Sequence, residues 1–282
     1  MTRFLTTADH SRDSVALTYI YPVVSRRSGG VSIGINLNTN NACNWRCLYC
    51  QVPNLKPGCA PPADLSLLGK ELRGFLQDVP HGGFMAQRVP PEMRRLNDIA
   101  LSGNGEPTGA ANFDAIIALV GEIMLEFDLI GKIKLVLITN GSLMHRPVVQ
   151  AGLRQMTRFG GEVWFKFDRA TAAGMRQVNN NRLSPENVRK CLGIAANLCP
   201  TWLQTCIFEL DGEPPNPVEC AAYLDFIATL PEAGIPLQGV QLYGLARPSL
   251  QPEAGRLADV SQAWREHFIA AIQARGLAVK AS

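Results

Sequence analysis

The sequence predicts an α/β protein folded as an open, partial (β/α)6 barrel. Six short apolar runs, bounded by glycine and proline, have the length and composition of buried strands. Stretches with helical periodicity lie between them, and this alternation favours parallel strands joined by right-handed crossovers. A full barrel needs eight strand–helix units, and only six are found, so a doubly wound sheet is the alternative architecture. The expected strands are 31–37, 98–102, 132–139, 162–168, 201–210 and 237–243.

The expected helices are marked by a period near 3.6 in their apolar residues and by capping signals. Ser184-Pro185 and Asn216-Pro217 each combine an N-cap residue with a proline at the first helical position. Glu219 is placed to close a capping box with Asn216. The periodic apolar segments predict helices over 65–79, 116–127 and 257–275.

Composition limits the class of protein. Hydrophobic residues make up 46% of the 282 residues and charged residues 18%, which excludes a disordered chain. The net charge of +3 is too small to indicate nucleic acid or an anionic membrane as a partner. We expect an N-terminal extension over 1–29, a core domain over 30–248 and a C-terminal helical tail over 249–282, with no separate second domain.

Location is indicated by what the sequence lacks. No run reaches the roughly 18 apolar residues of a membrane span, and residues 1–13 contain no apolar segment typical of a secretory signal. Eight cysteines are too few for a disulfide scaffold. We therefore expect a cytoplasmic protein without a membrane partner, in which clustered cysteines indicate a metal site or catalysis.

Three cysteines follow the first expected strand, with the spacing C-x3-C-x2-C. Thiolates of Cys43, Cys47 and Cys50 on one loop can bind three irons of a [4Fe-4S] cluster, which leaves the fourth iron without a protein ligand. An open coordination position is how a catalytic metal admits a substrate or cofactor. The alternatives are incidental cysteines or a zinc site. Structural zinc needs four ligands, and the nearest further cysteine is Cys59.

The cysteine motif, with the aromatic Tyr49 before its third cysteine, resembles the radical S-adenosylmethionine (radical SAM) superfamily. The resemblance implies that the open iron chelates S-adenosylmethionine through its amino and carboxylate groups, with Tyr49 among the cofactor-binding residues. An electron from the cluster then cleaves a carbon–sulfur bond to give methionine and a 5′-deoxyadenosyl radical, which abstracts hydrogen from a substrate that the sequence does not identify. It also implies a reductant such as flavodoxin or ferredoxin as partner.

A glycine-rich segment follows the second expected strand. Gly103 and Gly105 allow the backbone to approach a ligand closely, and the Glu106 carboxylate can pair with an ammonium group. The segment is similar to the glycine–glutamate motif of the superfamily, which binds the amino group of the methionine moiety, although Asn104 replaces the commoner glycine. The alternative is a plain turn with a solvated glutamate.

Polar residues at later strand ends are further candidates for cofactor binding. Thr139, Asn140 and Ser142 can bond a ribose or a carboxylate, or form an Asx-type turn. Lys166 and Asp168 lie on one face of the fourth strand, and an ion pair between them is the alternative to a role in binding.

The last two strands also carry polar residues on one face. Gln204 and Cys206 share a face of the fifth strand, and Gln241 and Tyr243 share a face of the sixth. We expect them to line the cavity, with Gln241 and Tyr243 as cofactor-binding candidates. The Cys206 thiol is a candidate hydrogen-atom donor, although a buried free cysteine is the simpler interpretation.

Within the superfamily, the segments INLNTNNACNWRCLYCQ, LSGNGEPT and LYGLARP are most similar to a branch near the enzymes that build the tricyclic wyosine base in tRNA. Only cluster and cofactor binding are carried over from that branch. Arg88, Arg94 and Arg95 form a thin basic patch, which is weak support for RNA. The alternatives are an RNA-modifying enzyme, a glycyl-radical-activating enzyme, or a non-catalytic iron–sulfur or zinc protein.

Overall fold

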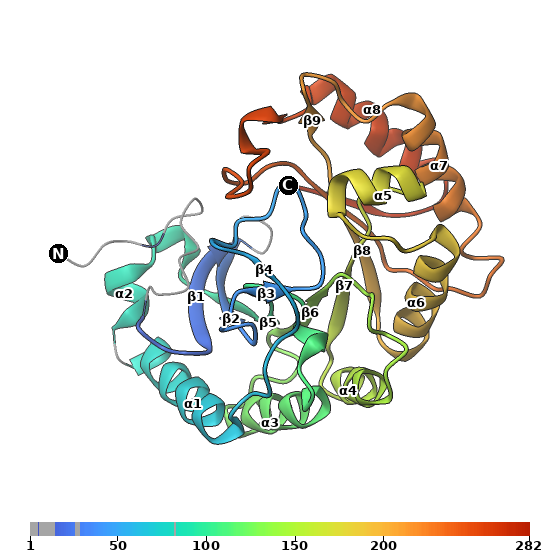
Figure 1. Ribbon diagram of the computed structural model, residues 1–282. Helices are drawn as coiled ribbons and strands as arrows, with labels where there is room; N and C mark the ends of the chain where they lie inside the picture. The colour runs from blue at the N-terminus through green and yellow to red at the C-terminus, as the bar shows by residue number, and fades with distance from the viewer. Residues whose placement is uncertain (1–4, 6–14, 26–28, 82) are drawn as a thin grey trace.

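The computed structural model describes residues 5, 15–25, 29–81 and 83–282. Eight strands form one curved sheet in the order β1-β2-β5-β6-β7-β8-β10-β12, with helices on its outer side (Figure 1). All neighbours are parallel except β1, which is antiparallel to β2. The sheet runs from β1 to β12 without closing within the described residues, so the predicted partial barrel is confirmed.

The six predicted strands form the centre of this sheet. They are β2 (Gly30–Ile35), β5 (Leu96–Leu101), β6 (Lys134–Thr139), β7 (Glu162–Lys166), β8 (Thr201–Cys206) and β10 (Gly239–Tyr243). Two strands of this sheet were not predicted, β1 (Ile20–Ser25) and β12 (Val279–Ala281). They come from the predicted N-terminal extension and the predicted C-terminal tail, so the sheet reaches beyond residues 30–248 on both sides. Residues 1–4, 6–14 and 26–28 of that extension lie outside the described residues.

Helices cover the outside of the sheet. They are α1 (Leu65–His81), α2 (Phe84–Arg88), α3 (Phe113–Glu126), α4 (Pro147–Arg158), α5 (Ala172–Asn179), α6 (Pro185–Leu198), α7 (Pro217–Ala228) and α8 (Gln262–Gln273). Three short 3-10 helices span Pro91–Met93, Pro107–Gly109 and Ala254–Arg256. The predicted caps are confirmed, because Ser184 accepts from the Asn187 N–H and Asn216 from the Glu219 N–H.

Two local predictions were wrong. Glu219 does not close a capping box, because its carboxylate accepts from the hydroxyl of Thr171 instead. The last helix begins at Gln262 rather than 257, since Ser261 caps it and Leu257–Ala258 forms β11. This strand pairs with β9 (Glu209–Leu210), which is separated from β8 by two residues.

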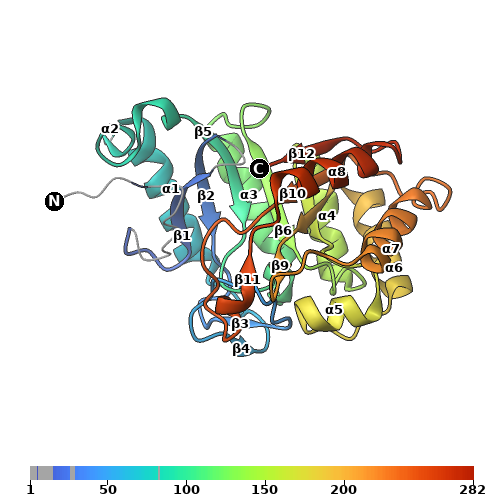
Figure 2. The same cartoon turned by 90° about the horizontal axis from the view of Figure 1, so that it is seen from above.

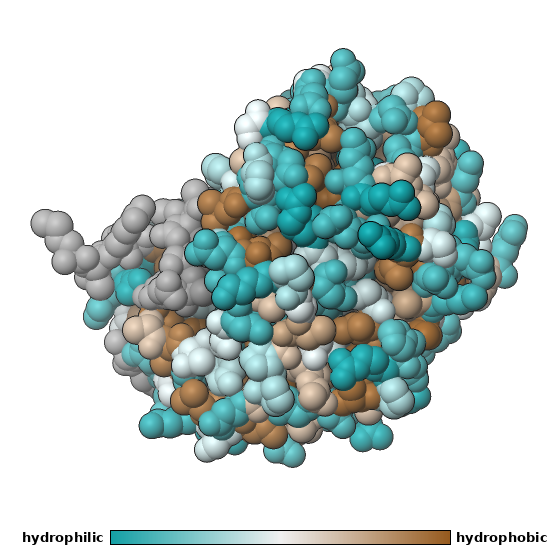
Figure 3. Space-filling model, viewed as in Figure 1, coloured by the Kyte–Doolittle hydropathy of each residue, from teal (hydrophilic) through white to brown (hydrophobic). Residues whose placement is uncertain are grey.

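One edge of the barrel gathers the short irregular elements. Figure 2 shows β3 (Ala42–Cys43), β4 (Lys56–Pro57), β11 and α5 on the same side of the sheet. The carboxyl ends of the parallel strands lead to this side, where chemistry is expected in α/β folds. On the outside, hydrophilic and hydrophobic side chains are interspersed over the face seen in Figure 3. Among the described residues, none of the helices combines the length and apolar character of a membrane span.

The approach to β1 is held by a buried carboxylate on α1. Glu71 accepts from the backbone N–H groups of Thr18 and Tyr19 at 2.8 Å each, and of Ile20 at 3.4 Å. Thr18 and Tyr19 precede β1, so the hydrogen bonds between β1 and β2 supply no partner for their N–H groups. A side chain on α1 therefore fixes the entry to the edge strand.

We expect Glu71→Ala to lower the free energy of unfolding by about 2–4 kcal/mol, because it leaves buried N–H groups without acceptors. Urea denaturation of the variant measures this loss. Lys70→Ala, at an exposed neighbouring position on the same helix, is the matched control and should change the free energy of unfolding by less than about 0.5 kcal/mol. A change of similar size in both variants would contradict the assignment.

Candidate functional site

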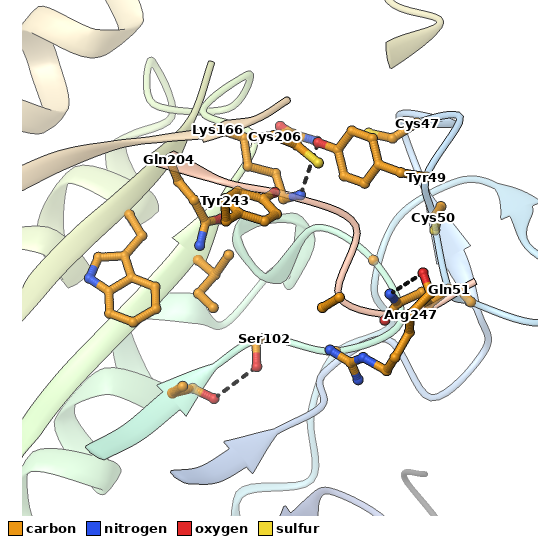
Figure 4. A pocket seen from close by; sticks show the side chains of 18 of the residues that line it. Cys47, Tyr49, Cys50, Gln51, Ser102, Lys166, Gln204, Cys206, Tyr243 and Arg247 are labelled. Carbon is orange, nitrogen blue, oxygen red and sulfur yellow. Dashed lines mark hydrogen bonds between the residues drawn. The ribbon is translucent and has the colours of Figure 1, made fainter. Parts of the chain in front are cut away.

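A cavity of about 260 Å³ lies in the space that the curved sheet surrounds, at the end of the barrel where the short elements gather. All three predicted cluster ligands, Cys43, Cys47 and Cys50, line it, together with Glu106 and Lys166. Figure 4 shows Cys47, Tyr49 and Cys50 on one side of the cavity and Lys166, Gln204 and Tyr243 on another. The structure therefore brings the cysteine motif and polar residues from several strand ends to one cavity.

The cysteine loop is folded by backbone hydrogen bonds to α5. The N–H groups of Arg46 and Leu48 donate to the carbonyl oxygens of Asn179 and Val178 at 3.2 and 2.8 Å. The side-chain amide of Asn179 donates to the Cys47 sulfur at 3.3 Å. The segment between Cys43 and Cys50 thus takes its shape from a helix more than 120 residues later in the chain.

Residues 249–253 hold the other side of the same loop. Arg46 makes two parallel hydrogen bonds to the Glu253 carboxylate, at 2.7 and 2.8 Å. The hydroxyl of Ser249 donates to the carbonyl oxygens of Leu48 at 2.6 Å and Cys50 at 3.2 Å. This clamp was not predicted. Nothing in the local sequence marks it, because its partners are about 200 residues apart.

The donor set of the loop fits an iron–sulfur cluster. Burial raises the pKa of the Cys43 thiol to about 12 and that of Cys47 to about 11, so a bound metal would have to displace their protons. Among the described residues, no three His, Cys, Asp or Glu side chains form a group that could hold a single metal ion. Three cysteines that each bind a different iron need not converge on one point.

Glu106 is a buried carboxylate bonded to neutral donors. Its Oε1 atom accepts from the hydroxyls of Thr108 and Thr139 at 2.6 Å each, and Oε2 accepts from the Asn140 N–H at 2.6 Å. Burial raises its pKa, and these hydrogen bonds oppose the rise. A carboxylate held by neutral donors in the wall of a cavity is suited to pair with an ammonium group.

The end of β6 is tied to the cysteine loop by a closed ring of hydrogen bonds. Asn140 donates to the Asn44 side-chain oxygen at 2.8 Å, Asn44 donates to the Ser142 hydroxyl at 2.8 Å, and Ser142 donates back to Asn140 at 2.7 Å. Of the three predicted residues, Asn140 lines the cavity, whereas Thr139 and Ser142 support Glu106 and Asn140 from behind.

The two glycines of the segment after β5 are required by close packing. A Cβ atom on Gly105 would lie 2.1 Å from the carbonyl oxygen of Ala42, directly before the first cysteine. Gly103 has φ +146, and a Cβ there would lie 2.3 Å from the Asn36 side-chain oxygen. Both glycines line the cavity, and both allow the segment before Glu106 to lie against the cysteine loop.

Tyr49, Lys166 and Asp168 form one buried cluster. The Tyr49 hydroxyl donates to Asp168 at 2.5 Å, and the Lys166 ammonium donates to the Tyr49 hydroxyl at 3.3 Å. Asp168 also accepts from Asn179 and from the Cys206 N–H, at 2.7 and 2.8 Å. Burial alone would lower the pKa of Lys166. The electrostatic effect of Tyr243, Cys47 and Asp168 outweighs burial, so the pKa is raised and the ammonium stays charged. Tyr49 and Lys166 line the cavity, and Asp168 lies behind them.

Residues of the last two strands complete the wall. Gln204, Cys206 and Tyr243 line the cavity as predicted. Gln241, which was also expected to line it, is not one of the described residues that do, and it is the in-register partner of Gln204 on the neighbouring strand. Burial raises the pKa of the Cys206 thiol well above its usual value. Arg247, which follows the sixth expected strand, also lines the cavity.

The solved structures that share this fold over most of the chain include the following three. SuiB from Streptococcus suis bound to the precursor peptide SuiA has a TM-score of 0.58 at 12% identity, covering 90% of this chain and 48% of that chain. A radical SAM methyltransferase from Sphaerobacter thermophilus has a TM-score of 0.58 at 12% identity, covering 90% and 66%. TYW1 with a lysine–pyruvate adduct bound has a TM-score of 0.55 at 11% identity, covering 88% and 74%. The chain has the fold of radical SAM enzymes, and it spans about half the length of the SuiB chain.

Sequence comparisons give less information about the family than the structural comparisons do. No protein-family model matches the chain. A segment of 135 residues is 27% identical to the GTPase Obg of Brachyspira hyodysenteriae, which covers 47% of this chain and 17% of that protein. The sequence contains no G-x4-G-K-[ST] motif, which forms the phosphate-binding loop of P-loop nucleotide hydrolases. The match therefore does not carry a GTP site to this chain.

We expect Gly105→Ala to destabilise the protein by about 1–3 kcal/mol, because the added methyl group must displace the backbone of the cysteine loop. Urea denaturation measures the effect. Gly74→Ala is the matched control, since a Cβ there meets nothing within 4 Å and alanine favours the helix by up to about 1 kcal/mol. Equal stability of Gly105→Ala and the unsubstituted protein would show that the close contact does not constrain the loop.

Proposed function

We propose that the chain is a radical SAM enzyme. The observation that carries the proposal is the position of Cys43, Cys47 and Cys50 in the wall of one cavity, beside a buried glutamate. The fold shared with radical SAM enzymes and the cysteine spacing support it independently. The eight cysteines form no disulfide, which fits the cytoplasmic location that we propose for this activity.

The three cysteines would hold a [4Fe-4S] cluster through three of its irons. When bound, the cluster and S-adenosylmethionine supply a one-electron cleavage that yields methionine and a 5′-deoxyadenosyl radical, which removes a hydrogen atom from the substrate. The chain contributes a loop fixed by Glu253 and Ser249, so that the thiols keep their positions. It also surrounds the reacting groups with a cavity wall that limits the access of water.

Glu106 would bind the amino group of the methionine moiety. Its Oε2 atom accepts one hydrogen bond from the protein, so it has the capacity to accept others. Gly103 and Gly105 let the backbone lie close to the bound cofactor, and Asn140 offers a polar contact in the same wall. Lys166, Tyr49 and Tyr243 also line the cavity, where they would contact the cofactor or the substrate.

The electron would come from a flavodoxin or ferredoxin, and the substrate is an organic molecule with a hydrogen atom that can be abstracted. The precursor peptide bound to SuiB supports a peptide as one class of substrate. Modification of RNA is less well supported, because Arg94 donates to the carbonyl oxygens of Ala86 and Val89, and Arg95 to that of Gly29. Activation of a glycyl radical enzyme is a further alternative, because it also begins with abstraction of a hydrogen atom.

We expect Cys47→Ala to abolish both the cluster and the cleavage of S-adenosylmethionine. After anaerobic reconstitution, the unsubstituted protein should hold about four irons and form 5′-deoxyadenosine when a strong reductant is added. Iron analysis and visible absorption measure the cluster, and mass spectrometry measures 5′-deoxyadenosine. Cys59→Ala, which changes an exposed cysteine of the same region, is the control and should retain both the cluster and the cleavage. A cluster that leaves S-adenosylmethionine intact would identify an electron carrier instead.

We expect Glu106→Gln to weaken S-adenosylmethionine binding by about tenfold or more, because a charge-assisted hydrogen bond to the ammonium group becomes a neutral one. Equilibrium binding of labelled S-adenosylmethionine to the reconstituted protein measures the change, with iron content confirming that the cluster is present. Glu122→Gln, on the exposed side of α3, is the matched control. Unchanged affinity in Glu106→Gln would remove the role proposed for this carboxylate.

A further inference from the structure

Two buried side-chain amides face the lumen of the barrel without a hydrogen-bond partner. Gln204 is 1% exposed and Gln241 is 6% exposed. The Nε2 atom of Gln204 and the Oε1 atom of Gln241 are both fully buried and bond to no atom of the described protein. Buried polar groups are paired in the great majority of cases, so two such groups side by side are unusual.

The two amides are immediate neighbours. Gln204 on β8 and Gln241 on β10 are Cα partners in a parallel ladder, so their side chains leave the same face of the sheet. Adjacent strands lie about 4.8 Å apart, which places the two amides within reach of one small ligand. Gln204 lines the cavity, and Figure 4 shows its amide directed into that space beside Tyr243.

Four polar side chains on another wall of the lumen are bonded to one another. Ser32 donates to Asp98, and the hydroxyls of Tyr21 and Ser102 are joined at 2.8 Å, on the wall formed by β1, β2 and β5. The wall formed by β8 and β10 differs from that wall, because its buried donor and buried acceptor bond to no atom of the described protein. A buried donor beside a buried acceptor is complementary to a group that offers one of each.

We propose that Gln204 and Gln241 bind an amide group of the substrate whose N–H and C=O lie on the same edge, as in a primary carboxamide or a lactam. Gln204 Nε2 would donate to the carbonyl oxygen and Gln241 Oε1 would accept from the N–H. A trans peptide bond directs these two groups to opposite sides, so the pair on one wall cannot hold both. The flat side chain of Trp164, on the neighbouring strand β7, lines the same cavity and offers an apolar surface for a planar ligand. The assignment of this group to the substrate rests on the proposed function.

Binding of small amide probes tests the pair directly. Saturation-transfer NMR with anaerobically reconstituted protein and S-adenosylmethionine would measure the affinities of 2-pyrrolidinone and propanamide. N-methyl-2-pyrrolidinone, which lacks the N–H, and N-methylacetamide, which is trans, are the comparison probes. We expect the first two to bind at least about fivefold more tightly than the last two, since each comparison probe loses one hydrogen bond. A preference for propanamide would indicate that the substrate presents a primary carboxamide. A preference for 2-pyrrolidinone would indicate that it presents a cyclic amide.

The variants Gln204→Leu and Gln241→Leu should each weaken binding of the preferred probe by about fivefold or more. Both should unfold at the same or a higher urea concentration than the unsubstituted protein, because no hydrogen bond within the protein is lost. Gln273→Leu, at an exposed position on α8, is the matched control and should leave probe affinity unchanged. Destabilised variants, equal binding of all four probes, or the absence of saturable binding would each overturn the inference. Probe binding without cleavage of S-adenosylmethionine would defeat the proposed function alone, and cleavage without probe binding would defeat this inference alone.

Discussion

The position of the cysteine loop depends on hydrogen bonds from segments that are far away in the sequence. The loop has little regular structure, since β3 contains two residues, and an ordered loop loses conformational entropy that other contacts must offset. Backbone bonds to Val178, the paired bonds between Arg46 and Glu253, and the ring through Asn140 approach it from three sides. The geometry of the three thiols is therefore a property of the whole barrel rather than of the motif.

The same constraint explains why the site is rich in buried polar groups. Glu106 and Asp168 are both nearly inaccessible carboxylates, and burying a charge is unfavourable unless donors compensate it. Asp168 receives donors from Tyr49, Asn179 and the Cys206 backbone, so it orders the elements behind the cavity. Glu106 receives neutral donors and lines the cavity itself. One carboxylate thus has a positioning role, and the other is available to a cationic ligand.

The sequence was sufficient to predict what is encoded locally. The six central strands and the caps at Ser184 and Asn216 follow from short-range patterns, and the structure confirms them. The strands β1 and β12 were missed because an edge strand that completes a sheet is selected by its partner rather than by its own periodicity. The same limit applies to the site: the cysteine spacing and the strand-end residues could be found, whereas the clamp formed by Ser249 and Glu253 could not.

The polar groups of the cavity differ in how they are satisfied, and this difference divides the cavity into two regions. Near the cysteine loop, Glu106, Tyr49 and Asn140 are each bonded within the protein, which holds them in a fixed geometry toward a ligand. On β8 and β10 the two glutamine amides lack such bonds, and a protein tolerates this loss of stability where binding requires it. A region with fixed geometry suits a cofactor, because the same cofactor binds there in every reaction cycle. An unpaired donor and acceptor suit the recognition of one particular substrate, because a competitor without the matching groups leaves them buried and unpaired.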